Sequence, residues 1–131
     1  MEENQQELMF KLSMFEQQIQ GIQQQLQAVE KAIIELNSLS LGLEGLKGKT
    51  GQEIMAPIGK GIFIKAKLIS EDLRVDVGGK NFVVKDIDST KKLIGEQVGK
   101  LGEAQGDLEN AMQEINQQLT QVMMESQKKD K

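Results

Sequence analysis

The sequence lacks two residue types on which many enzymes and metal sites depend. Its 131 residues include no cysteine and no histidine. Without cysteine the chain has no disulfide, no thiol nucleophile and no thiolate ligand. Without histidine it lacks the commonest general base and the commonest metal ligand in proteins. These absences argue against an enzyme and against a bound cofactor or metal.

Aromatic residues and long apolar runs are also scarce. The chain has four phenylalanines, no tyrosine and no tryptophan. No apolar run approaches the ~20 residues that a membrane-spanning helix needs, and the acidic N-terminus lacks the basic start of a signal peptide. A net charge of −4 argues against a broad nucleic-acid surface. We therefore expect a soluble cytoplasmic protein that binds neither nucleic acid nor membrane.

Two heptad seams of equal length dominate what the sequence does contain. Apolar residues at alternating steps of four and three predict one helix over 8–43 and another over 87–125. The first seam is Leu8, Leu12, Phe15, Ile19, Ile22, Leu26, Val29, Ile33, Leu36, Ser40 and Leu43. The second seam is Ile87, Lys91, Ile94, Val98, Leu101, Gln105, Leu108, Met112, Ile115, Leu119 and Val122. A chain that folds back between equal seams brings the start of the first helix beside the end of the second.

Several features of the two helices are left open or are predicted from single residues. The polar seam positions Ser40 and Lys91 lead us to expect that the helices splay where they meet the central segment. Either Asp86 or Asp88 is a suitable N-cap for the second helix. A stripe of glycines in that helix allows three interpretations. The glycines permit close approach to the first helix, they make the helix flexible for its function, or they are sequence drift that is tolerated because the seam holds the helices together. The stripe consists of Gly95, Gly99, Gly102 and Gly106.

The central segment, residues 53–85, has the pattern of β-strands. Apolar and polar residues alternate in short stretches, and Gly59-Lys60-Gly61 and Gly78-Gly79-Lys80 are typical of tight turns. The segment therefore predicts two β-hairpins. With a polar tail at residues 126–131, we expect residues 1–131 to form a single domain.

The two hairpins present apolar side chains on both faces, which a thin pair of helices cannot cover. Exposed edges and apolar faces favour pairing with other chains. We expect an α+β fold, a long antiparallel coiled-coil helical hairpin with two β-hairpins at the connecting end, contributing to an oligomeric β-barrel. The residues expected to mediate assembly are Ile58, Ile62, Phe63, Ile64, Leu68, Val75, Val77, Phe82, Val83 and Val84.

A second cluster of apolar residues lies at the opposite ends of the predicted helices. Several of its members do not occupy seam positions, so the pairing of the two helices does not require them. Methionine is flexible and polarisable and suits surfaces that bind many sequences. We interpret the cluster as a binding tip, the alternative being ordinary packing onto the seam. It consists of Leu8, Met9, Phe10, Leu12, Met14, Leu119, Val122, Met123 and Met124.

The sequence contains only an incomplete motif for nucleotide binding. Gly48-Lys49-Thr50 is similar to the end of a phosphate-binding loop, but Leu43 occupies the position of its first glycine. We therefore predict no nucleotide site.

The string Ala56–Ala66, followed by Val75–Gly78 between two equal helices, resembles the prefoldin family, in particular its archaeal alpha subunits. The resemblance implies an alpha2-beta4 hexamer, in which prefoldin beta subunits join through a double β-barrel and six coiled-coil arms project from it. It also implies an ATP-independent holding chaperone that captures unfolded polypeptides at the arm tips and passes them to a group II chaperonin. The alternative is a structural coiled-coil adaptor that docks one defined partner.

Overall fold

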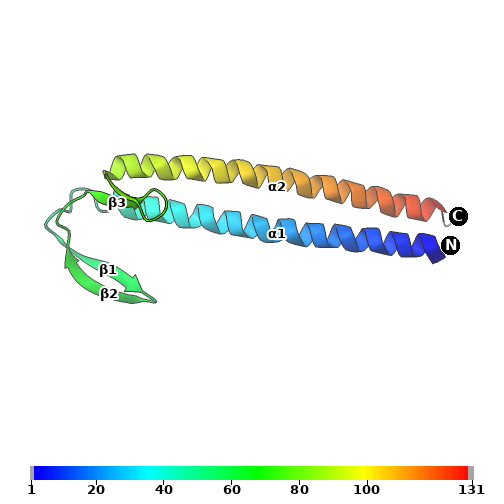
Figure 1. Cartoon of the computed structure of the whole chain (residues 1–131), viewed down its shortest axis with the longest axis horizontal. Coiled ribbons are helices and arrows are strands. Elements are labelled where there is room, and N and C mark those ends of the chain that lie inside the picture. The colour runs from blue at the N-terminus through cyan, green and yellow to red at the C-terminus, as the bar shows by residue number, and fades with distance from the viewer. Residues whose placement is uncertain (1, 130–131) are drawn as a thin grey trace. The chain divides into compact units, whose positions relative to one another are not determined.

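The computed structural model describes residues 2–129, and the side chains of residues 5–126. The elements follow one another along the chain (Figure 1) as α1 (Glu2–Glu44), β1 (Glu53–Gly59), β2 (Ile62–Lys67), β3 (Leu73–Asp76), β4 (Phe82–Lys85) and α2 (Ile87–Lys129). Two long helices and two β-hairpins confirm the predicted fold class. Helix α1 begins earlier than residue 8, and α2 continues through Lys129 into the segment expected to be a tail. The last two residues of that expected tail lie outside the described residues.

The chain divides into two compact units. The first combines Met1–Ile33 with Gly99–Lys131. In it, the N-terminal part of α1 runs antiparallel to the C-terminal part of α2 (Figure 1). The seam residues from Leu8 to Ile33 and from Leu101 to Val122 are all half-buried, whereas the charged residues on the outer faces are exposed. This alternation is what a narrow apolar stripe between two helices produces, so both predicted seams are confirmed here.

The second unit, Ile34–Val98, holds the most buried side chains of the described residues. Leu43 at the end of α1 packs with Ile87 and Ile94 at the start of α2. Further apolar side chains surround this cluster, namely Leu36, Leu46, Leu73 and Val98. The predicted splaying of the helices at this end is therefore wrong. Apolar seam residues on either side of the polar positions pack together at this end.

Ion pairs explain how the polar seam position Lys91 is accommodated. Its Nζ lies 2.5 Å from Oε2 of Glu44, so the ammonium group reaches across to α1. Lys47 Nζ pairs with the same Glu44 oxygen at 3.3 Å and with Oδ1 of Asp88 at 2.5 Å. Hydrogen bonds from Lys91 and Lys47 lower the pKa of Glu44, and those to Asp88 and Glu44 raise the pKa of Lys47. We name Glu44, Lys47, Asp88 and Lys91 the junction ion pairs.

The start of α2 resolves the choice between the two candidate caps. Asp86 Oδ1 accepts a hydrogen bond of 2.7 Å from the backbone N–H of Ser89, and the helix begins at Ile87. Asp86 is therefore the N-cap, and this bond lowers the pKa of its carboxyl group. The Thr90 hydroxyl donates a 2.8 Å hydrogen bond to the backbone oxygen of Asp86, which satisfies a buried side chain.

The four strands form two separate antiparallel hairpins. β1 pairs with β2, from Glu53 opposite Lys67 to Pro57 opposite Phe63. The register then shifts, beside a proline that has no N–H to donate to the ladder. β3 pairs with β4 along its whole length. Both turns require left-handed backbone at a lysine, with φ of 51° at Lys60 and 63° at Lys80.

A carboxylate ties together the two loops that flank the first hairpin. Glu71, in the loop before β3, accepts a hydrogen bond from the backbone N–H of Gly48, in the loop after α1. Backbone hydrogen bonds between Gly51 and Leu68 and between Leu68 and Gln52 extend the β1–β2 ladder toward this point. The base of the hairpin is thereby fixed to the connections on both sides of it.

Candidate functional site

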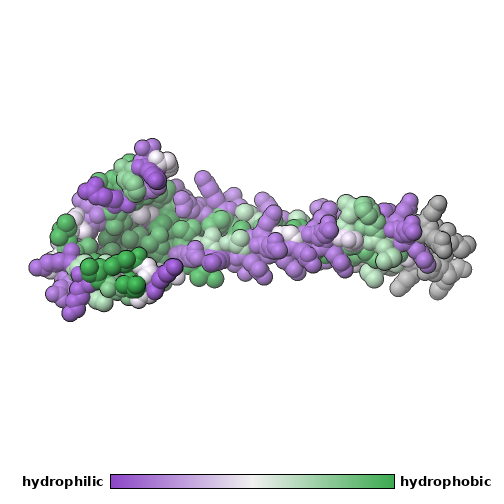
Figure 2. Space-filling model, turned by 60° about the horizontal axis from the view of Figure 1, so that its bottom comes forward, coloured by the Kyte–Doolittle hydropathy of each residue, from purple (hydrophilic) through white to green (hydrophobic). Residues whose placement is uncertain are grey.

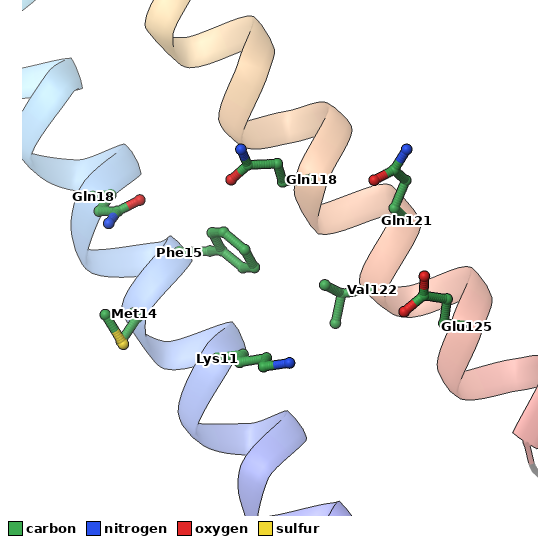
Figure 3. A pocket seen from close by; sticks show the side chains of 8 residues that line it. All are labelled: Lys11, Met14, Phe15, Gln18, Gln118, Gln121, Val122 and Glu125. Atoms are coloured by element: carbon green, nitrogen blue, oxygen red, sulfur yellow. The ribbon is translucent and has the colours of Figure 1, made fainter.

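The first candidate surface is the arm tip, which we define as residues 8–15 of α1 with residues 119–124 of α2. Both segments belong to the first unit. Phe15 and Val122 point toward each other from the two helices (Figure 3), and an open groove of about 340 Å³ lies there. The groove is lined by Lys11, Met14, Phe15, Gln18, Gln118, Gln121, Val122 and Glu125. The structure thus brings the two ends of the predicted cluster together.

The residues of the arm tip fall into two groups by exposure. Leu8, Leu12, Leu119 and Val122 are half-buried in the seam. The off-seam members are exposed instead, namely Met9, Phe10, Met14, Met123 and Met124. Met9 is 70% exposed and Phe10 is 67% exposed, so neither side chain folds back onto the seam. The tip therefore presents apolar atoms that the pairing of the helices does not use.

The second candidate surface is the hairpin surface, the apolar side chains carried by β1 to β4. Figure 2 shows apolar side chains gathered over the strands of the second unit. Leu68 and Val75 are half-buried, and the other residues expected to mediate assembly are exposed. The exposed ones are Ile58, Ile62, Phe63, Ile64, Val77, Phe82, Val83 and Val84. A surface of this extent and composition is typical of protein–protein contact.

Two exposed apolar residues near the hairpins were missed by the sequence analysis. Met55 lies opposite Lys65 on the face that also carries Phe63, and strict alternation along β1 would have identified it. Ile69 lies in the loop after β2, where no periodic pattern applies, and it is also exposed. The polar residues that line the tip groove were missed for a related reason, because a sequence pattern does not show which outer positions of two helices meet.

Among the described residues, neither a metal-binding group nor a membrane-spanning helix is found. No group of three or more acidic side chains is placed to hold a metal ion within the part of the chain that the structure describes. Among these residues no helix is long and apolar enough to cross a membrane. What the two surfaces can offer is apolar contact, at the arm tip and at the hairpins.

Comparison with known proteins relates this arrangement to one family. The family model described as "Prefoldin subunit" matches residues 15–131. The prefoldin subunit alpha of Methanobrevibacter smithii is 32% identical over 117 residues, which cover 88% of this chain and 75% of that protein. The prefoldin subunit alpha of Methanococcus maripaludis is 31% identical over 104 residues, covering 68% of this chain and 71% of that protein.

The fold is also found in a solved structure. A chain from the cryo-EM structure of filamentous PFD from Methanocaldococcus jannaschii matches with a TM-score of 0.78. The match covers 88% of this chain and 97% of that chain, at 20% sequence identity. At this identity the likeness is one of fold alone.

Proposed function

Since this chain belongs to the prefoldin family of chaperones, we propose that it captures unfolded polypeptides at its arm tip without ATP and delivers them to a group II chaperonin. The observation that carries the proposal is the exposure of five off-seam apolar residues at the arm tip. The whole chain would act as one prefoldin-like domain in the cytoplasm. Its helices would present the tip, and its hairpins would join it to other subunits.

Membership of the family implies assembly with other prefoldin subunits, and we propose an alpha2-beta4 hexamer with prefoldin beta subunits. The exposed hairpin surface supports this proposal. Residues such as Ile62, Phe82 and Val84 would be costly to leave in water, since burying one such side chain contributes about 1.5–3 kcal/mol. Pairing of hairpins from different subunits into a barrel would remove both the apolar faces and the open strand edges from solvent.

The free energy available from one arm tip is too small for that tip alone to hold an unfolded polypeptide firmly. Fully burying a methionine or phenylalanine contributes about 1.5–3 kcal/mol. Association first costs an estimated 4–15 kcal/mol in lost freedom, so two or three such contacts bind only weakly. Several tips that contact one unfolded chain together raise the effective concentration of each further contact. Weak tips on a multivalent assembly can thus hold a client and still release it.

The test replaces Met9, Phe10, Met123 and Met124 together by serine and assembles the variant with its beta partner. These side chains are exposed and off the seam, so the hexamer should form normally. We expect weaker suppression of the aggregation of an unrelated denatured protein, followed by light scattering. The mass of the assembled complex, measured on the same samples, checks that assembly is intact.

A matched control removes exposed apolar side chains of α1 away from the tip. Ile34 and Leu41 are 65% and 76% exposed and lie in the other unit. Ile34→Ser with Leu41→Ser should leave aggregation suppression unchanged. Unchanged suppression by the tip variant, or an equal loss in the control, would contradict capture at the tip. Capture of one protein only, with no effect on unrelated clients, would favour the coiled-coil adaptor.

Release of a labelled client to added chaperonin tests the delivery step separately.

A further inference from the structure

The methionines of this chain are distributed unevenly between exposed and covered positions. The sequence has seven, and six of them have described side chains. Four lie at the arm tip, where Met9, Met14, Met123 and Met124 are 70%, 45%, 51% and 57% exposed. Met112 is half-buried in the seam of the same unit, and Met55, 59% exposed, lies on β1 in the other unit, on the hairpin surface proposed to be covered by partner subunits. The chain therefore carries a concentrated set of accessible thioethers where apolar contact is proposed.

We propose that these four methionines form a modification site for peroxide, and that their oxidation to sulfoxide switches off capture of clients at the arm tip. This inference rests on the proposed function of the tip. It adds that the tip is sensitive to oxidants because its apolar surface is built largely from thioethers. Phe10 is the other off-seam apolar side chain exposed there, and peroxide does not oxidise it under mild conditions.

The reaction is a two-electron oxygen transfer. A lone pair of the methionine sulfur attacks one oxygen of hydrogen peroxide, the O–O bond breaks, and an S–O bond forms. The departing hydroxide takes up the proton that the transferred oxygen loses and leaves as water. Sulfur is oxidised, the peroxide is reduced, and no carbon–sulfur bond changes. Susceptibility follows exposure of the sulfur, so the four tip residues should react before Met112.

Oxidation opposes capture because it replaces a flexible apolar group by a polar, chiral one. A sulfoxide retains its hydrogen bonds to water only while it stays exposed, so covering it with a client becomes unfavourable. Loss of the apolar contribution of even one well-covered methionine corresponds to roughly tenfold in affinity. The helices themselves should persist, since the four side chains are off the seam.

The first experiment maps the reaction. The assembled complex is treated with a limited amount of hydrogen peroxide and digested, and each methionine is assessed by mass spectrometry. We expect sulfoxide at Met9, Met14, Met123 and Met124 well before Met112, whose position in the seam of the same unit makes it the internal control. Equal rates at Met112 and at the tip would overturn the assignment of a selective site.

The second experiment isolates the effect on capture. A variant carrying Met9→Leu, Met14→Leu, Met123→Leu and Met124→Leu keeps the tip apolar but not oxidisable. Complexes of both chains with the same beta subunits are treated with peroxide and compared in client binding. We expect roughly tenfold weaker binding for the unmodified chain and a smaller change for the leucine variant. Circular dichroism checks that the helices remain folded in both.

The outcomes separate this inference from the proposed function. If neither chain binds client before peroxide is added, the proposed function fails. If both bind before treatment and peroxide weakens both equally, or neither, the proposed function stands and the methionine site is overturned. Methionine sulfoxide reductase added after the peroxide treatment should restore client binding to the chain that carries the native methionines. If the reductase removes the sulfoxide and binding does not return, that result would also count against the site.

Discussion

Replacing the glycine stripe of α2 by alanine gives the sharpest test of why a long helix contains four glycines. A Cβ added at Gly95, Gly99, Gly102 or Gly106 would have no heavy atom within 4 Å other than those of its immediate neighbours and of its own helix backbone. Close approach to α1 is therefore not the reason for these glycines within this chain. Each glycine in a helix interior costs about 1 kcal/mol relative to alanine, so the four together weaken α2 by up to about 4 kcal/mol.

The expected result is a stepwise gain in the stability of α2. Gly102→Ala alone should slow amide hydrogen exchange of its helical turn about fivefold, the factor that 1 kcal/mol corresponds to. The measurement is native-state hydrogen exchange of the assembled complex, read for residues 95–106. Gly21→Ala in α1 is the matched control, because a Cβ there also meets nothing within 4 Å. It should slow exchange around its own turn and leave α2 unchanged.

Faster exchange in the alanine variants would refute this reasoning. It would mean that the stripe needs room for another subunit, since the chain itself provides no contact there. If stability rises as expected, aggregation suppression by the fourfold variant distinguishes the two remaining interpretations. Reduced capture would indicate that the helix has to bend, and unchanged capture would indicate tolerated drift.

Three further predictions concern the junction and the first turn. Asp86→Ala should lower the Tm of the complex because the Ser89 N–H loses its acceptor, and Asp86→Asn should lower it less. Lys60→Gly should stabilise the chain by about 1 kcal/mol in denaturant unfolding, because Lys60 has a φ of 51°. Glu44 has a folded-state pKa below its ordinary value of 4.5, so its contribution to stability is complete above that value. In acid unfolding this contribution should be lost as the pH falls through the lowered pKa, and Glu44→Gln should abolish the effect. An acid-unfolding midpoint that is unchanged in the variant would contradict this prediction.

The features that the sequence predicted well are those with a strict local period. The steps of four and three fix which side of each helix is apolar, so both seams are found as rows of half-buried and buried residues. The two turns were equally predictable, because Gly-Lys-Gly and Gly-Gly-Lys favour left-handed backbone, which is observed at Lys60 and Lys80. The exposure of Met9 also follows from the period, since it lies one step off the seam.

What could not be predicted depends on residues that are distant in sequence. The ion pair between Lys47 and Asp88 joins the loop after α1 to the start of α2, and no local pattern shows that their side chains meet. For the same reason the polar position Lys91 was taken as a sign of splaying, although Glu44 is within its reach on the other helix. The groove at the arm tip depends likewise on which outer residues of the two helices come to face each other.

The small core of the second unit has a consequence for the lone subunit. In the part of the chain that the structure describes, Leu43, Ile87 and Ile94 are the only buried apolar side chains, while most of the hairpin surface is open. A fold with so little interior gains much of its stability by mass action from whatever binds it. The melting temperature of a subunit made in excess should therefore depend on the concentration of its partners. Orphan copies would be the first to be degraded, so proteolysis itself would balance the supply of the different subunits.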